Sequence, residues 1–294
     1  MMPFRNILFP VDFSDAAFVM VPLVMEIARR FEANVTVLHA FNLVTEYNLA
    51  PNTGNLRGFE PPAIAYTAAL QGLRDSRKRR LEEFVRTQFP DVRHLALIED
   101  GDPALVIEWA ARRENADLTI MPTRGLGRFR RLLLGSVTAK VLHDLGCPVL
   151  TSAHERDPTS TEPSGFRSIL CAVNLSAQPD SVLRTAGFLA QTYGARICLL
   201  HIEPASGVNG VPSTPQEILQ IYERAVKTDG PRAGVKPAVR IIDATIPEGI
   251  RQTAIEEAAD LMVVGRGHMQ GILSQAWSHL YTIIRESPCP VLSV

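Results

Sequence analysis

The sequence of this chain contains one segment twice. Residues 5–39 align without a gap on residues 167–201, and the closing run Cys147-Pro148-Val149-Leu150 recurs as Cys289-Pro290-Val291-Leu292. The two copies differ at one acid, because Asp12 becomes Asn174 in the second copy. Any function assigned to the chain must therefore explain two related but unequal halves.

The repeat predicts two domains. A chain of 294 residues is long enough for each half to bury its own core. The stretch between the copies is polar and rich in proline and serine, as linkers are. We expect a first domain over 1–153, a linker over 154–165 and a second domain over 166–294.

Composition narrows the class of protein. Hydrophobic residues make up 46% of the chain, as in a globular protein. The formal net charge is -1, so neither sign of charge predominates enough to indicate binding to nucleic acid or to a membrane surface. The first residues show no signal-peptide pattern, and no stretch approaches the roughly 20 apolar residues of a membrane helix. We expect a soluble, cytoplasmic protein with neither a nucleic-acid nor a membrane partner.

The cysteines and histidines do not suggest a metal site. The four cysteines, Cys147, Cys171, Cys198 and Cys289, lie in apolar segments without the paired spacing of zinc or redox motifs. They are interpreted as buried, reduced thiols. His39 and its repeat equivalent His201 have no accompanying carboxylate cluster and are interpreted as structural.

Apolar runs in the first half alternate with helical patterns. Strands are predicted at residues 6–11, 34–39, 93–98, 117–121 and 148–151, and helices at 15–31, 68–89, 103–115 and 132–145. Ser14 is a natural N-cap for the first helix. Strands that are apolar on both sides require helices on both faces of a parallel sheet. Each half is therefore predicted to be a doubly wound α/β domain.

Ligands of open parallel sheets bind beyond the carboxyl ends of the strands. Asp12 follows the first strand, and a glycine-bearing loop follows the fourth. In that loop nine residues separate Gly125 from Gly135-Ser136, which opens a helix. Backbone N–H groups and the positive end of a helix dipole favour an anion there, which predicts phosphate binding.

These motifs resemble those of the universal stress protein family, whose nucleotide-binding members carry two glycine turns spaced in this way. The resemblance covers nearly the whole chain as two tandem copies, and it includes Val11-Asp12-Phe13-Ser14 and the closing run of each half. It implies a five-stranded parallel sheet per half, in the order 3-2-1-4-5, and an ATP site in the members that bind ATP.

The resemblance also implies roles for individual residues. Asp12 would accept from the adenine amino group or the ribose, with Val11 and Ala40 flanking the base, and Gly125, Gly135 and Ser136 would hold phosphates. The expected cofactor is ATP, AMP or ADP, with Mg²⁺ accompanying the phosphates. The full set of expected binding residues is Val11, Asp12, Ser14, Ala40, Met121, Arg124, Gly125, Arg128, Gly135, Ser136, Val137 and Thr138.

The first glycine of the motif is replaced by Pro122. Proline has no N–H, so the turn loses one donor; a charge-assisted hydrogen bond is worth about 1.5–3 kcal/mol. Arg124 and Arg128 lie nearest the glycines and offer phosphate partners that compensate for this donor. The alternative is a solvated basic turn.

The second half departs further from the motif. Its second glycine is replaced by His268, and Trp277-Ser278 stands where Gly135-Ser136 stands in the first half. An indole at that position blocks the close approach of a phosphate to the backbone. We expect the second half to bind nucleotide poorly and to serve as a structural partner.

Three functions fit these observations. The first is an adenine-nucleotide-binding sensor or regulatory module that is not an enzyme, because no general base accompanies the phosphate loop; slow ATP hydrolysis is compatible with it. The second is a protein that binds no nucleotide and acts on an unknown protein partner through a surface such as residues 41–62. The third, a substrate-adenylating enzyme, lacks a substrate-side signature.

The resemblance also implies an arrangement of the halves. They are expected to pair as an intramolecular pseudo-dimer through their last strands, and a homodimer of the whole chain is a further possibility.

Overall fold

The computed structural model describes residues 4–42, 63–123, 134–152, 165–175, 180–203, 214–227, 235–266 and 275–294. The chain divides into two compact units, one spanning Phe4–Ile120 and the other running from Met121 to Val294. Each unit is described by itself. Most of the linker expected at 154–165 lies outside the described residues, and the domain boundaries stay a prediction.

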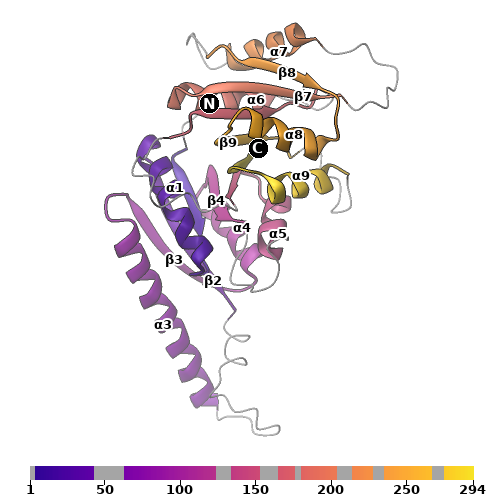
Figure 1. Cartoon of the computed structure of the whole chain (residues 1–294). Helices are drawn as coiled ribbons and strands as arrows, with labels where there is room; N and C mark the ends of the chain where they lie inside the picture. Colours follow the sequence, from indigo (N-terminus) through magenta and orange to yellow (C-terminus); the bar gives the residue numbers. More distant parts are fainter. Residues whose placement is uncertain are drawn as a thin grey trace. The chain divides into compact units, whose positions relative to one another are not determined.

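The first unit is a parallel sheet with helices (Figure 1). Its elements are β1 (Asn6–Pro10), α1 (Asp15–Phe31), β2 (Asn34–Phe41), α3 (Ala63–Gln88), β3 (His94–Asp100), α4 (Pro103–Arg113) and the start of β4 (Leu118–Pro122). The strand order is β3-β2-β1-β4. β1 and β2 are almost wholly buried, as predicted from their continuous apolar runs.

The second unit contains a mixed sheet with helices. Its elements are α5 (Ser136–Asp144), β5 (Val149–Ser152), β6 (Ser168–Ala172), α6 (Asp180–Tyr193), β7 (Arg196–Ile202), α7 (Pro215–Lys227), β8 (Ala238–Ile242), α8 (Ile246–Glu256), β9 (Leu261–Val264), α9 (Gln275–Glu286) and β10 (Val291–Ser293). The strand order is β5-β10-β9-β6-β7-β8.

The predicted strand order is confirmed in both repeats. The first repeat reads β3-β2-β1-β4-β5 and the second reads β8-β7-β6-β9-β10, each of which is 3-2-1-4-5 when counted within its own repeat. The registers agree as well, since Ile7 lies opposite Leu118 and the repeat-equivalent Ile169 lies opposite Leu261. The repeat seen in the sequence is therefore a repeat in topology.

The last strands of the two repeats pair with each other. β5 and β10 are antiparallel, and Leu150 lies opposite Leu292, its own repeat equivalent. Antiparallel pairing about two equivalent residues is the pattern of a two-fold interface. The predicted contact through the closing strands is thus present within the second unit, and a homodimer of the whole chain stays a prediction.

Several predicted element boundaries were wrong by a few residues. α3 begins at Ala63 rather than residue 68, and α5 begins at Ser136 rather than residue 132. Gly135 has φ -62° and ψ 144°, an extended conformation that cannot continue a helix, so α5 starts after it. The N-cap of α1 is confirmed, because the Ser14 hydroxyl accepts a hydrogen bond from the Ala17 N–H.

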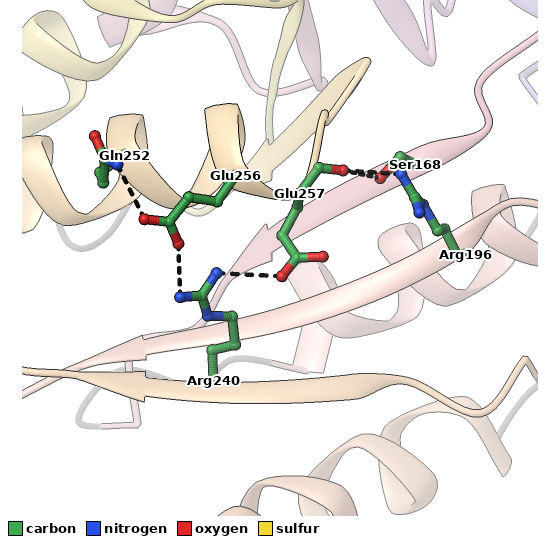
Figure 2. A network of polar contacts seen from close by, with 6 residues as sticks. All are labelled: Ser168, Arg196, Arg240, Gln252, Glu256 and Glu257. Carbon is green, nitrogen blue, oxygen red and sulfur yellow. Dashed lines mark hydrogen bonds and ion pairs between the residues drawn. The ribbon is translucent and has the colours of Figure 1, made fainter.

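A polar network ties the second repeat together (Figure 2). The Arg240 guanidinium on β8 contacts Glu256 at 2.7 Å and Glu257 at 3.2 Å, both at the end of α8. The backbone carbonyl of Glu257 accepts from Ser168 and Arg196 on the neighbouring strands. One arginine thus joins both carboxylates to the sheet.

Three of the four cysteines are buried, as predicted, and the fourth is less buried than expected. Cys171, Cys198 and Cys289 are buried, whereas Cys147 is only half-buried because it lies in the turn before β5. Burial raises the pKa of the Cys198 thiol to about 11 and that of Cys289 to about 12. These two thiols stay protonated and unreactive at neutral pH.

Candidate functional site

The residues after β1 form a tight turn in the first unit. The Val11 N–H donates to the Leu38 carbonyl at 2.8 Å and extends the β1–β2 contact. The Asp12 carboxylate then accepts from the Ser14 N–H at 3.0 Å, which fixes the side chain against the start of α1. Asp12 is half-buried at the carboxyl end of β1, where the sequence placed it.

Phe13 holds this turn in an unusual backbone conformation. Its φ is 56°, in the left-handed region that non-glycine residues rarely adopt. The ring is buried 4.5 Å from the His39 ring and 5.8 Å from the Phe84 ring, and the Arg80 guanidinium lies 4.4 Å above it. Such strain persists only where packing imposes it, and it is concentrated at functional turns. The sequence contained no signal for it.

His39 and His201 have matching structural roles. The Nδ1–H of His39 donates to the Val11 carbonyl at 2.8 Å, and that of His201 donates to the Val173 carbonyl at 2.9 Å. Each imidazole therefore fixes the carbonyl at the end of the first strand of its repeat, as the structural interpretation requires. Ala40 follows His39 at the end of β2 and is half-buried.

The second unit contains the strand-to-helix connection of the phosphate motif. Met121 is buried in β4, and the Pro122 carbonyl accepts from the Thr138 hydroxyl at 3.1 Å. The Gly135 N–H donates to the Thr123 carbonyl at 2.8 Å. Two of the residues expected to contact phosphate, Gly135 and Thr138, therefore use these groups to fix α5 against the end of β4.

The first turn of α5 has main-chain donors that lack a partner within the helix. Gly135 is the N-cap and supplies no side-chain hydrogen bond to the helix. The first N–H groups of a helix have no partner within it, and in α5 these include the N–H groups of Ser136 and Val137. Ser136 is exposed and Val137 half-buried. This turn offers an anion two N–H groups and a hydroxyl.

Three expected phosphate contacts, Arg124, Gly125 and Arg128, lie outside the described residues and stay predictions. The same holds for most of the stretch over 41–62, of which only Phe41 and Asn42 are described.

The corresponding part of the second repeat is built differently. α9 begins at Gln275, three residues before Ser278, whereas α5 begins at Ser136, the equivalent of Ser278. The Ser278 N–H thus lies beyond the first three residues of its helix, where unpaired donors end. The side chains of Trp277 and His268 lie outside the described residues, while Asn174 is exposed.

Arg266 occupies the position in the second repeat that Thr123 occupies in the first. Its guanidinium donates to the carbonyls of Leu145 and Cys147, in the loop between α5 and β5, and to that of Ser293 at 3.3 Å. Burial lowers the pKa of this guanidinium from its usual value, but arginine remains charged in proteins. A cation of the second repeat thus fixes the loop that ends α5.

The described residues contain no candidate metal centre. No group of three or more His, Cys, Asp or Glu side chains among them could hold a metal ion. Hydrogen bonds from Gln252 and Arg240 lower the pKa of Glu256, so this carboxylate is not a general acid at neutral pH. Within the same ranges, none of the helices combines the length and apolarity that crossing a bilayer requires.

Comparison with known proteins places both repeats in one family. The sequence model of the universal stress protein family matches residues 3–152 and again residues 165–294. A universal stress protein of Thermus aquaticus is 36% identical over 147 residues, which is 50% of this chain and 97% of the relative. One from Methanocaldococcus jannaschii is 28% identical over 147 residues, covering 50% of this chain and 81% of the relative.

A solved structure has the same fold over the full length. The crystal structure of a universal stress protein from Archaeoglobus fulgidus aligns with a TM-score of 0.70 at 20% identity, covering 100% of this chain and 97% of that chain.

Proposed function

The chain is a member of the universal stress protein family, and on that premise we propose that its first repeat binds an adenine nucleotide, ATP or its AMP and ADP relatives. The observation that carries the proposal is the start of α5, where the N-cap Gly135 has no side chain to cover the helix N–H groups. The equivalent helix of the second repeat, α9, begins three residues earlier in the alignment. We propose that the protein acts in stress responses as a nucleotide-dependent regulatory module in the cytoplasm.

The proposed roles follow the local geometry. The N–H groups of Ser136 and Val137 and the Ser136 hydroxyl bind phosphate oxygens, and Gly135 leaves that approach uncovered. Asp12, fixed by the Ser14 N–H, accepts from the base or the ribose. Val11 and Ala40 flank the base beside the buried Met121, and hydrogen bonds of Ser14 and Thr138 fix the helix starts around these groups.

The remaining expected contacts belong to the same proposal. Arg124 and Arg128 pair with phosphate oxygens, and Gly125 offers a further N–H. A Mg²⁺ ion arrives with the phosphates, which supply its oxygen ligands. The sequence of the phosphate motif, residues 122–138, contains no Asp, Glu or His that could act as a general base. We therefore propose binding rather than turnover, with hydrolysis no faster than a slow side reaction.

The carboxylate of Asp12 gives the first test. We expect Asp12→Ala to weaken ATP binding about ten-fold, because a hydrogen bond to a charged acceptor is worth about 1.5–3 kcal/mol. The ATP affinity of Asp12→Asn should lie between those of the wild type and Asp12→Ala, because the amide carbonyl of asparagine still accepts a hydrogen bond. Isothermal titration of the purified full-length chain measures all three affinities.

The second repeat supplies the matched control. Asn174→Ala changes the equivalent position in the second repeat and should leave ATP affinity at the wild-type value. An equal loss in Asp12→Ala and Asn174→Ala would contradict the assignment to the first repeat. If the wild-type chain binds no ATP at all, the proposed function itself fails.

A protein-binding role is the second candidate, and one surface of the first unit favours it. Leu105 and Trp109 on α4 are 58% and 46% exposed and lie four residues apart, so they share a helix face. Arg113 stacks on the Trp109 ring at 4.1 Å and extends this face. Exposed apolar side chains of this kind are typical of contact surfaces.

A further inference from the structure

A side chain of the second repeat contacts the phosphate motif of the first. The Leu134 N–H donates to the hydroxyl oxygen of Tyr281, on α9, at 3.1 Å. Both residues belong to the second compact unit. Since Gly135 is the N-cap of α5, this phenol contacts the residue immediately before the N-cap.

The donors of the motif determine what this contact can do. The Leu134 N–H donates to Tyr281 and the Gly135 N–H donates to Thr123, so neither is directed at a ligand. A phenol that accepts one hydrogen bond keeps its own O–H for donation. The Tyr281 side chain is half-buried, so its surface remains partly accessible. It therefore adds a neutral donor near the first N–H groups of α5, which have no partner within the helix.

The sequence makes this contact one-directional. Cys147 and Cys289 set an offset of 142 between the repeats, which places Tyr281 opposite Ala139 and Leu134 opposite Ala276. Alanine has no hydroxyl, so the first repeat cannot return the same hydrogen bond to the second. The tyrosine hydroxyl is therefore found only in the second repeat, where it contacts the residue before Gly135 and Ser136 of the first repeat.

We propose that Tyr281 belongs to the phosphate site of the first repeat and donates its hydroxyl proton to a phosphate oxygen of the bound nucleotide. The inference rests on the proposed function of the first repeat and deepens it. The second repeat then does more than complete the sheet, because it supplies a ligand-binding side chain to its neighbour. Affinity for the phosphate portion of the ligand depends on both copies.

Tyr281→Phe tests the donor directly, with ATP and adenosine as the two probes. We expect the full-length variant to bind ATP about ten-fold more weakly than wild type, the loss for one hydrogen bond to a charged group. Its affinity for adenosine, which has no phosphate, should stay within two-fold of wild type. Tyr222→Phe is the matched control, since it removes a hydroxyl that contacts the Val235 carbonyl instead, and it should change neither affinity.

The outcomes separate the inference from the proposed function. If the wild-type protein binds no ATP, the proposed function and the inference are both wrong. Wild type that binds ATP, with an unchanged Tyr281→Phe, overturns the role of Tyr281 alone. An equal loss for ATP and adenosine, or a collapse of amide protection throughout α5 in the nucleotide-free variant, also overturns it, because Tyr281 would then only dock α9 onto the loop.

Discussion

Gly135→Trp is expected to weaken ATP binding by 100-fold or more, on the order of the loss of two charge-assisted hydrogen bonds. The substitution introduces a tryptophan at position 135, which is equivalent to Trp277 in the second repeat. An N-cap side chain lies over the N–H groups of the first helical turn, which is how serine and aspartate caps reach them. An indole there covers the donors of Ser136 and Val137.

The backbone at this position tolerates the change. Gly135 has φ -62°, which every residue adopts readily, so its role is to leave space rather than to supply conformational freedom. The variant should therefore stay folded, as checked by its circular dichroism and its urea unfolding midpoint. Isothermal titration with ATP gives the affinity.

A control at a second glycine separates loss of the site from loss of packing. Gly146 follows α5, and a Cβ there meets no atom within 4 Å. Gly146→Ala should keep wild-type affinity for ATP. A folded Gly135→Trp variant that binds ATP as tightly as Gly146→Ala would contradict phosphate binding at the start of α5.

Arg266→Met is expected to lower the free energy of unfolding of the second unit by about 3 kcal/mol, the upper end for hydrogen bonds from a charged donor. The methionine retains much of the aliphatic volume but leaves the carbonyls of Leu145, Cys147 and Ser293 without this donor. Urea unfolding followed by tryptophan fluorescence measures the change. Hydrogen exchange should show faster opening at the end of α5.

An exposed arginine of the same unit provides the comparison. Arg251 pairs with Glu248 on the surface of α8, and surface ion pairs contribute little to stability. Arg251→Met should leave the unfolding midpoint close to wild type. Equal midpoints for the Arg266 and Arg251 variants would show that the three carbonyl contacts do not stabilise the unit.

Local patterns and the family resemblance together were enough to predict most of the fold. Continuous apolar runs gave the buried strands, Ser14 gave the start of α1, and the family resemblance gave the strand order that both repeats show. Boundaries were less certain where a single backbone conformation decides them. The extended Gly135, for example, delays α5 by four residues relative to the apolar pattern.

The site was predictable only in part, because its other features depend on contacts between distant residues. The left-handed Phe13 is held by Arg80 and Phe84, which lie on α3 far along the chain. The hydrogen bonds of Arg266 and Tyr281 join the two repeats across more than a hundred residues. No periodicity or motif within one repeat indicates such pairs.

The number of ATP molecules bound per chain tests the central claim most directly. The full-length protein, stripped of any retained nucleotide, is titrated with ATP and Mg²⁺ in a calorimeter. The account predicts one site per chain, present in Asn174→Ala and lost in Gly135→Trp. Two equivalent sites per chain, or one site that survives Gly135→Trp, would contradict it.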